Sequence, residues 1–541
     1  MATVWLTSQR RGRESQVESG MVESSLEAAN ASHGISGTDQ ADQIEVLNPA
    51  TGERIAAVPI DPPEAVAATV ARVRANQPEW EAIGIEGRYR WLGKLRDWLL
   101  DNSERVLDTM QAETGKVRAD ASGEPVYLAD LINFYGKKAA EFIGEESVRP
   151  HTSLLASKKL RVQYRPHPVV GIISPWNFPL ILALGDAIPA LQAGAAVVVK
   201  PSEFTPLGLA EVVKAWKEEI GGPDVFDCVQ GVGETGGALV DAVDFVQFTG
   251  SDRTGRKVMA RAAETLTPVS LELGGKDAMI VLDDADLDRA ANAAAWGGMM
   301  NSGQICMSVE RIYVEEPAYN SFVAKLTDAV GRLRQGADGR GFGKEVGAMT
   351  SPNQTAIVED HVQDALASGA RALTGGRRLP GPGDYFEPTV LVDVDHSMKV
   401  MRDETFGPVV GVMKVRDAEE ALRLANDSRY GLSGSVFGER ARAERIARRV
   451  ECGAVNVNDV LVNYAAMDVP MGGWKQSGIG YRHGEPGIKK YCRTESVVIT
   501  RFGGKREATW YPYTKGRRRI ISLVARAFNA RDLKRRFGIS S

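Results

Sequence analysis

Cys306 is the residue whose surroundings most strongly suggest a chemical role. It follows the helical segment DADLDRAANAAAWGGMM and lies in the polar, glycine-containing turn NSGQIC. Such a turn can expose a sulfur atom and surround it with backbone N–H groups, which would stabilise the reactive thiolate. The alternative for a single cysteine is a small buried hydrophobic residue. We give that interpretation to Cys228, Cys452 and Cys492, because their surroundings are apolar or strand-like.

Glu272 and Asn177 could serve the same chemistry. Glu272 interrupts the apolar strand of PVSLELGGKD, where a charge costs free energy unless it has a role or a partner. A partly buried carboxylate can act as a general base near neutral pH, and the alternative is a salt-bridged strand end. Asn177, in SPWNFP, directly follows an apolar strand, and its amide could donate to a developing oxyanion. In the alternative, its segment is an ordinary turn.

Glycine-rich turns and a charged strand end predict a dinucleotide site. GVGETG, which contains Gly233, matches the pattern G-x-G-x-x-G, and FTGS, which contains Gly250 and Ser251, leads into a helical segment. A helix N-terminus favours an anionic group such as pyrophosphate, although glycine-rich turns are common. Lys200 and Glu203, in KPSE, follow a strand and could bind the hydroxyl groups of a ribose. A carboxylate suits a free 2′-hydroxyl and not a 2′-phosphate, so the sequence favours NAD over NADP.

Alternating strands and helices must position these residues. The segments 169–173, 195–199 and 244–248 are short, apolar and rich in β-branched residues, as strands of a parallel sheet are when both faces are buried. Helical spacing precedes them from about 61 to 144, and a second alternating region runs from about 278 to 460. The sequence therefore predicts an α/β protein with two α/β domains.

The composition narrows the classes of function. The chain has 541 residues and a net charge of −4, which gives no sign of nucleic-acid binding. Its four cysteines form no CxxC pair and its six histidines are scattered, so we expect neither a metal site nor a disulfide framework. Sparse cysteine fits a reducing cytoplasm. Polar residues such as Asp186 interrupt the longest apolar stretch, 181–199, so we expect a buried helix and strand there rather than a membrane span.

The two ends of the chain differ from the rest. Residues 1–42 are poor in large apolar side chains and are expected to be a disordered tail, within which Met21 could be the true start. Residues 505–541 contain eleven Lys or Arg and two acidic residues, so this basic tail carries about +9. Its apolar residues follow helical spacing: Ile520, Val524, Ala527 and Phe528. A basic amphipathic helix can lie on an anionic membrane, and the alternative is packing on another subunit or on the acidic remainder of the chain.

Eight segments together resemble the aldehyde dehydrogenase superfamily. In chain order they are NPATGE, SPWNFP, KPSE, FTGS, LELGGK, NSGQIC, ETFGP and PMGGWKQSG. Their order and spacing extend over about 450 residues, and only the two tails fall outside the match. The segment SVERIYVE also resembles a branch of the family that contains bacterial succinate-semialdehyde dehydrogenases.

The resemblance implies a covalent mechanism. Cys306 would attack an aldehyde to give a thiohemiacetal, Asn177 and the Cys306 backbone N–H would hold the oxyanion, and hydride transfer would leave a thioester. Glu272 would activate the water that hydrolyses the thioester. The resemblance also assigns cofactor contacts: Trp176, Lys200 and Glu203 at the adenosine end, Gly233, Gly250 and Ser251 at the adenosine and pyrophosphate, and Leu273, Glu404 and Phe406 at the nicotinamide ribose and ring. The expected cofactor is NAD, with NADP less favoured.

Similarity to the family also implies a domain organisation and a homo-oligomer, a dimer or tetramer. The expected segments are 43–147 and 168–274 for a Rossmann-like NAD-binding domain, 275–475 for an α/β catalytic domain, and 148–167 with 476–504 for a small β oligomerisation element and closing segment. Within this element, a hairpin near 148–167 would pair with a strand near 488–503. The basic tail, 505–541, follows.

The substrate is predicted to be a medium or bulky hydrophobic aldehyde. Succinate-semialdehyde enzymes of this family commonly carry an arginine six residues before the nucleophile, and this chain has Met300 there. The tunnel positions of Gly185 and Ala465 are small, and Met471 is flexible. The alternatives are a succinate-semialdehyde dehydrogenase, a coenzyme-A-acylating enzyme, against which Glu272 argues, and a non-catalytic structural or binding homologue.

Overall fold

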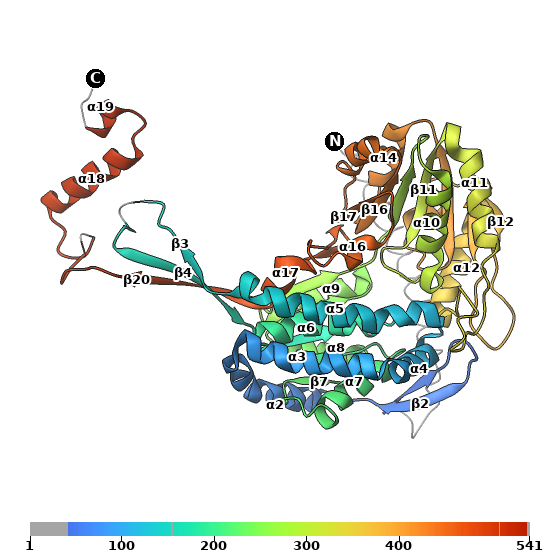
Figure 1. The fold of residues 1–541 in the computed structure, drawn as a ribbon, viewed down its shortest axis with the longest axis horizontal. Coiled ribbons are helices and arrows are strands. Elements are labelled where there is room, and N and C mark those ends of the chain that lie inside the picture. Colours follow the sequence, from blue (N-terminus) through green and yellow to red (C-terminus); the bar gives the residue numbers. More distant parts are fainter. Residues whose placement is uncertain (1–41, 153–154, 508, 538–541) are drawn as a thin grey trace, which may run out of the picture.

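The computed structural model describes residues 42–152, 155–507 and 509–537, which form two α/β halves and a projecting β arm (Figure 1). The predicted N-terminal tail lies outside the described residues, apart from Asp42. The first described strand, β1 (Gln43–Leu47), pairs antiparallel with β2 (Arg54–Pro59) beside the first half.

The first half is built on a sheet in the strand order β19-β9-β8-β5-β6-β7. Its strands run parallel, except that β19 pairs antiparallel with β9. Nearly all of their residues are apolar, which allows the central strands to be buried on both faces. The bounds are β5 (Val169–Ile173), β6 (Ala196–Lys200), β7 (Phe226–Cys228), β8 (Phe245–Thr249), β9 (Val269–Glu272) and β19 (Gly478–Ile479).

Helices before and between these strands cover the sheet. The predicted helical spacing forms the buried faces of α2 and α3, through side chains such as Val70 and Leu95. The bounds are α2 (Pro63–Ala82), α3 (Gly84–Asp101), α4 (Ser103–Thr114), α5 (Arg118–Ile143), α6 (Ile181–Ala193), α7 (Leu207–Glu218), α8 (Gly233–Ala242) and α9 (Asp252–Glu264).

Two of the predicted strands are displaced by one residue. The segment 195–199 was expected where β6 runs from Ala196 to Lys200, and 244–248 where β8 runs from Phe245 to Thr249. Ala195 belongs to the turn after α6, because its N–H donates to the carbonyl of Ala190 (3.1 Å). The charged Lys200 nevertheless pairs with Ile173 in the ladder. The prediction from residue polarity therefore placed the strand end one residue too early.

The second half is built on a sheet in the order β12-β13-β14-β11-β10-β16-β17, parallel except for β12. Separate hydrophobic cores fill its two faces, one under α10 and α11 and the other under α12, α14 and α15. The strands are β10 (Asp277–Val281), β11 (Val309–Glu315), β12 (Arg371–Thr374), β13 (Thr389–Val392), β14 (Val409–Val415), β16 (Ser433–Phe437) and β17 (Ala454–Val457). The helices are α10 (Leu287–Met299), α11 (Glu316–Gly331), α12 (Pro352–Ala367), α13 (Lys399–Arg402), α14 (Ala418–Asn426), α15 (Arg440–Ala447) and α16 (Val462–Ala465).

A three-stranded antiparallel sheet forms the arm. Its central strand, β4 (Lys158–Pro166), pairs with β3 (Glu146–Val148) and with β20 (Cys492–Thr500), as the predicted pairing of 148–167 with 488–503 requires. The helix α17 (Gly484–Lys489) leads into β20. After β20 the chain continues into α18 (Lys515–Asn529) and α19 (Leu533–Arg536), which lie beyond the arm and away from both halves (Figure 1). Among the described helices, none has the length and apolarity needed to cross a bilayer.

The connections between strands bring the predicted site residues together. β6, β5, β8 and β9 are successive neighbours in the first sheet, so the loops that follow them lie along one edge. β9 ends at Glu272 and β10 starts at Asp277, so the short segment 273–276 leads directly from the first sheet to the second. Cys306 lies between α10 and β11 of the second sheet. The carboxyl edge of the first sheet thus meets the loops of the second half.

Candidate active site

A cavity of about 260 Å³ lies where the two halves meet. Its walls come from the loops after β5 and β8, the end of β9, the turn before β11 and the segment before β14. Its lining includes nine of the twelve site residues predicted from the sequence: Trp176, Asn177, Gly250, Ser251, Glu272, Leu273, Cys306, Glu404 and Phe406. Cys306, Glu272 and Asn177, which are far apart in the chain, therefore share one space.

The turn before Cys306 has a left-handed backbone. Asn301, Ser302 and Gly303 have φ angles of 51°, 55° and 69°. Glycine is needed at the third position, because a Cβ atom on Gly303 would lie 2.0 Å from the carbonyl oxygen of Gly407. The side-chain amide of Gln304 donates to the Asn301 carbonyl (3.0 Å), and its oxygen accepts from the N–H of Thr350 (2.9 Å). These contacts fix the backbone just before the cysteine.

Burial dominates the chemistry of the Cys306 thiol. Desolvation raises the pKa of this thiol to about 12, and the carboxyl groups of Asp277 and Glu404 add to the effect. Hydrogen bonds from the backbone N–H groups of Cys306 and Met307 lower the pKa. The turn therefore supplies the expected N–H donors, but burial outweighs them, and the thiol is protonated at neutral pH.

Glu272 ends β9 in an ion pair with Arg482. The side chains of both residues are buried, with exposed fractions of 6% and 4%. The same guanidinium donates to the carboxylate of Asp186 (2.6 Å) and to the hydroxyl of Thr249 (2.5 Å). Glu272 thus stands at a salt-bridged strand end, as the structural alternative predicted, and it also lines the cavity with Cys306. The ion pair compensates its buried charge without removing the carboxylate from the cavity.

Asp186 balances the positive charge of this network. Its carboxylate also accepts from the Lys490 ammonium (3.2 Å) and the Tyr491 hydroxyl (2.8 Å). Desolvation acts to raise the pKa of Asp186, but the charges of Arg482 and Lys490 outweigh it and hold the pKa well below its usual value. Asp186 is therefore ionised and links α6 to the segment that carries Arg482.

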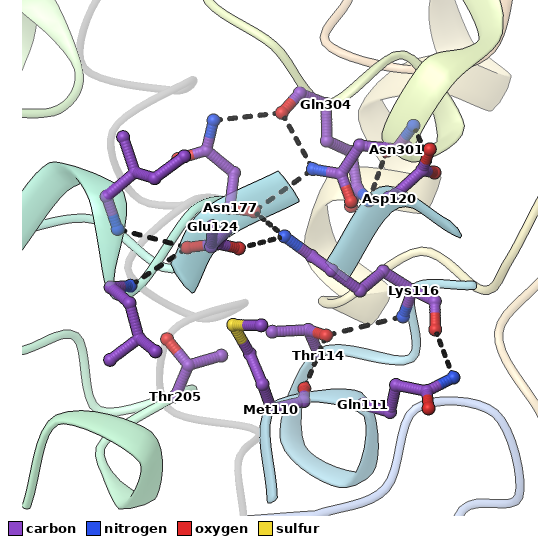
Figure 2. Close-up of polar contacts among 12 residues, drawn as sticks. Met110, Gln111, Thr114, Lys116, Asp120, Glu124, Asn177, Thr205, Asn301 and Gln304 are labelled. Atoms are coloured by element: carbon purple, nitrogen blue, oxygen red, sulfur yellow. Dashed lines mark hydrogen bonds and ion pairs between the residues drawn. The ribbon is translucent and has the colours of Figure 1, made fainter. Parts of the chain in front are cut away.

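A second buried network fixes the loop of Asn177 (Figure 2). The ammonium of Lys116 lies between the carboxylate of Glu124 (2.7 Å) and the backbone carbonyl of Asn177 (2.8 Å). The other oxygen of Glu124 accepts from the backbone N–H groups of Leu180 (3.1 Å) and Ile181 (3.0 Å), at the start of α6. An ion pair at the start of α5 therefore holds both ends of the segment that contains Asn177.

Hydrogen bonds also join the Asn177 loop to the turn before Cys306. The side-chain amide of Asn177 donates to the carbonyl of Gln304 (2.9 Å), and that of Asn301 donates to the carbonyl of Asn177 (3.1 Å; Figure 2). Asp120 accepts from the Asn301 N–H (2.8 Å). A primary amide has two hydrogens, so after the bond to Gln304 the Asn177 side chain has one further hydrogen to donate.

Glu404 and Phe406 are positioned by a buried ion pair between β10 and β11. Lys276 pairs with Glu310, whose carboxylate accepts from the N–H groups of Thr405 (2.8 Å) and Phe406 (2.9 Å). The Phe406 ring then meets Trp176 edge-on, with centroids 5.4 Å apart. Glu404 accepts from the N–H of Gly275 (3.0 Å). Burial, with the nearby charge of Glu310, raises the pKa of Glu404 to about 8, so this carboxyl is mostly protonated at neutral pH.

The three other predicted cofactor residues lie outside the lining of this cavity. Lys200 ends β6, and its ammonium, 3.3 Å from Glu203, also donates to the carbonyl of Pro201 (2.8 Å). Desolvation lowers the pKa of the Lys200 ammonium. The Glu203 side chain is 40% exposed, so its carboxylate is accessible at the strand edge. Gly233 starts α8 beside open space, because a Cβ atom there would have nothing within 4 Å.

The residues predicted to line the substrate tunnel do not line this cavity. None of Gly185, Met300, Ala465 and Met471 is among the described residues that line the cavity. A Cβ side chain on Gly185 would meet no atom within 4 Å, which agrees with a small residue beside open space. Met471 is only 1% exposed and packs in a hydrophobic core, so it is a core residue in this structure.

Four important side chains were missed in the sequence. Lys116, Glu124 and Arg482 stand in no recognisable pattern, and their partners are distant in the chain. Asp186 did give a signal, because it is a charge within the apolar stretch 181–199. Burial makes such a residue costly without a partner. We used this charge only against a membrane span; it could also have indicated a buried ion pair, although not the partner.

Comparison with known proteins places this geometry in a family. The model of the "Aldehyde dehydrogenase family" matches residues 36–497. A "4,4'-diapolycopene aldehyde oxidase" of Methylomonas sp is 40% identical over 475 residues, which cover 87% of this chain and 88% of that protein. A "Putative succinate-semialdehyde dehydrogenase [NADP(+)]" of Mycolicibacterium smegmatis is 40% identical over 459 residues, which cover 83% of this chain and 87% of that protein.

The chain belongs to the aldehyde dehydrogenase family.

Solved structures agree with this assignment. A putative aldehyde dehydrogenase, PutA, from Anabaena variabilis superposes with a TM-score of 0.83 at 37% identity, covering 87% of this chain and all of the other. Lactaldehyde dehydrogenase from Escherichia coli gives 0.81 at 34% identity, covering 86% and 96%. The predicted fold class is therefore confirmed as the α/β fold of this family. As an aldehyde dehydrogenase, the protein is an oxidoreductase that acts on aldehydes, so the alternative of a non-catalytic homologue is wrong.

Proposed function

We propose that this aldehyde dehydrogenase oxidises a hydrophobic aldehyde to the carboxylic acid with NAD, through a covalent intermediate on Cys306. The observation that carries the proposal is the shared cavity, in which a thiol, an ion-paired carboxylate and an amide donor occur together. A thiol that attacks a carbonyl needs a donor for the oxyanion, and a thioester needs a base for its hydrolysis. Cys306, Asn177 and Glu272 supply these three functions.

The side chains would act in sequence. The Cys306 thiol loses its proton to solvent water and its sulfur bonds to the aldehyde carbon, while the remaining Asn177 amide hydrogen and the Cys306 backbone N–H donate to the oxyanion. A nicotinamide cofactor, when bound, supplies the acceptor for the hydride. The resulting thioester on Cys306 is attacked by water whose proton Glu272 accepts, and the C–S bond breaks to release the acid and the thiol. Because Glu272 is retained at the cavity, hydrolysis is favoured over acyl transfer to coenzyme A.

The strand edge offers an elongated site for the cofactor. Lys200 at the end of β6 and Glu203 after it would bind the adenosine ribose beside Trp176 and Gly233. Gly250 and Ser251, before α9, would lie at the pyrophosphate. At the cavity, Leu273, Glu404 and Phe406 would border the nicotinamide ribose and ring. The accessible Glu203 carboxylate supports NAD, because it would repel a 2′-phosphate. Two relatives carry NADP(+) in their names, so a preference of this enzyme for NADP is the alternative to be tested.

Two observations favour a hydrophobic substrate. Met300, at the sequence position where an arginine would pair with a substrate carboxylate, is uncharged. Leu182 and Ile357 line the same cavity as Cys306. A relative named for a diapolycopene aldehyde is 40% identical to this chain over 475 residues. Relatives named succinate-semialdehyde dehydrogenase keep that activity as the second candidate function.

The arm supports assembly into a homo-oligomer, a dimer or tetramer. Its strands expose apolar side chains, including Val148, Val498 and Ile499, at 43%, 61% and 43%. An extended sheet with exposed apolar residues and free edges suits pairing with another subunit. We place the enzyme in the cytoplasm, where a reducing environment keeps a catalytic thiol free.

The decisive experiment compares the Cys306→Ser and Cys228→Ser variants. Both cysteines are partly buried, and burial raises the pKa of each thiol to about 12, but only Cys306 lines the cavity. The assay uses NAD with aliphatic aldehydes, aromatic aldehydes and succinate semialdehyde. Formation of reduced cofactor should vanish in Cys306→Ser and persist in Cys228→Ser. Near-normal turnover by Cys306→Ser would reject the nucleophile. Higher catalytic efficiency with succinate semialdehyde, or with NADP, would reject the corresponding part of the proposal.

A further inference from the structure

The helix α18 has opposed basic and apolar faces. Lys515, Arg518, Arg519 and Arg526 lie along one side, together with Ser522 and Leu523. Away from that side, Ile520 and Phe528 are 61% and 59% exposed. The chain has no acidic residue between Glu507 and Asp532, so the positive charge of this helix is not neutralised within it. This separation of charge from apolar surface is what a helix needs to lie at the boundary between water and an apolar phase.

Packing on the rest of the chain does not account for these faces. No residue of α18 is buried. Among the described residues, the only ion pair within 515–537 joins Arg535 to Asp532, inside the tail itself. The family match ends at residue 497, so α18 is an addition to the shared fold. Figure 1 shows it beyond the tip of the arm, where a flat surface could approach it without meeting either α/β half.

Aromatic residues precede the helix. Trp510, Tyr511 and Tyr513 are 58%, 73% and 73% exposed. Tyrosine and tryptophan have an apolar ring with a polar tip, and they are enriched where hydrocarbon meets water. They therefore extend the amphipathic character of α18 toward the arm.

We propose that α18 docks in the plane of a membrane surface that contains anionic lipids. The basic face would contact the headgroups, and Ile520 and Phe528 would enter the upper acyl region. A polyanion such as a nucleic acid would neutralise the same cations but would leave the apolar face in water, so a lipid surface fits both faces. The docking stands independently of which aldehyde the enzyme oxidises.

The test measures co-sedimentation of the full-length protein with lipid vesicles. Vesicles of mixed phosphatidylglycerol and phosphatidylcholine should bind the protein at low ionic strength, and vesicles of phosphatidylcholine alone should not. Raising the salt concentration should weaken binding, because the charges are exposed and screened. Each basic residue near an anionic surface contributes about a fivefold gain in partitioning, so R518Q/R519Q/R526Q should lower the partition coefficient about 100-fold.

Two further variants test whether binding depends on the basic and apolar faces of α18 or only on the total charge of the protein. R440Q/R445Q/R448Q removes three arginines from and beside α15 in the body, and it should leave vesicle binding near the wild-type value. I520S/F528S retains every charge and should lower partitioning by about tenfold or more, because two large apolar side chains no longer enter the bilayer. All variants should keep the oligomeric state and the turnover of a short, water-soluble aldehyde.

Several results would overturn the docking. They are absence of binding to anionic vesicles at low ionic strength, equal losses in the tail and α15 triple variants, and full binding by I520S/F528S. A change of oligomeric state in the tail variants would show instead that the apolar face packs on another subunit.

Discussion

Replacing Lys116 by methionine should expose the cost of the ion pair that supports Asn177. The side chains of Lys116 and Glu124 are 1% and 0% exposed, so neither charge is solvated. The ammonium also lies over the Phe178 ring, 4.2 Å from its centroid. Loss of one partner of a buried ion pair costs about 3–5 kcal/mol, because the other charge stays buried without compensation. Lys116→Met should lower the free energy of unfolding by that amount.

The double variant Lys116→Met/Glu124→Gln distinguishes the effect of the buried charge from the effect on the position of Asn177. Glu124→Gln removes the stranded charge but keeps an oxygen that can accept from the N–H groups of Leu180 and Ile181. The double variant should therefore recover most of the stability and lose only about 1–2 kcal/mol, the scale of a missing hydrogen bond. It cannot restore the Lys116 contact to the Asn177 carbonyl. A misplacement of about 1 Å costs about 100-fold in rate, so we expect a drop in kcat of about tenfold to 100-fold in both variants.

Urea unfolding and steady-state kinetics test these two effects. Lys138→Met is the control, because Lys138 forms an exposed pair with Glu141 near the other end of α5, and its stability and kcat should equal those of the wild type within error. If Lys116→Met unfolded within about 1 kcal/mol of the wild type, the argument from an uncompensated charge would be wrong. If the double variant regained wild-type kcat, the contact to Asn177 would have no part in positioning the oxyanion donor.

Two other predictions concern Glu272 and Cys306. Glu272→Gln should retain a pre-steady-state burst of reduced cofactor and then turn over slowly, because acylation precedes the water attack; loss of the burst would assign Glu272 to an earlier step. Since burial raises the pKa of the Cys306 thiol to about 12, its thiolate fraction in the ligand-free enzyme should rise about tenfold per pH unit through the neutral and mildly alkaline range. Peptide-resolved alkylation with iodoacetamide should follow that rise, and a plateau near pH 8 would contradict it.

Local patterns predicted those parts of the molecule that depend on local chemistry. The strand 169–173 coincides with β5, because its β-branched and apolar residues are buried on both faces. Polarity at Lys200 led to an error of one residue at β6 because an ammonium at a strand end can still pair through its backbone. The left-handed turn before Cys306 was recognised as a turn, but the need for glycine at 303 comes from the carbonyl of Gly407, about a hundred residues further along the chain.

Asp186 shows what a single sequence can and cannot reveal about a buried site. A carboxylate within an apolar helix must find positive charge or hydrogen-bond donors, so its presence at 186 predicts such partners. The partners are Arg482, Lys490 and Tyr491, all from one short segment near the arm. Nothing in their spacing distinguishes that segment from other basic stretches of a chain with 66 Lys and Arg. Only the fold identifies the pairing, and because the same Arg482 also pairs with Glu272, the charge that interrupts an apolar helix becomes part of the support for the proposed base.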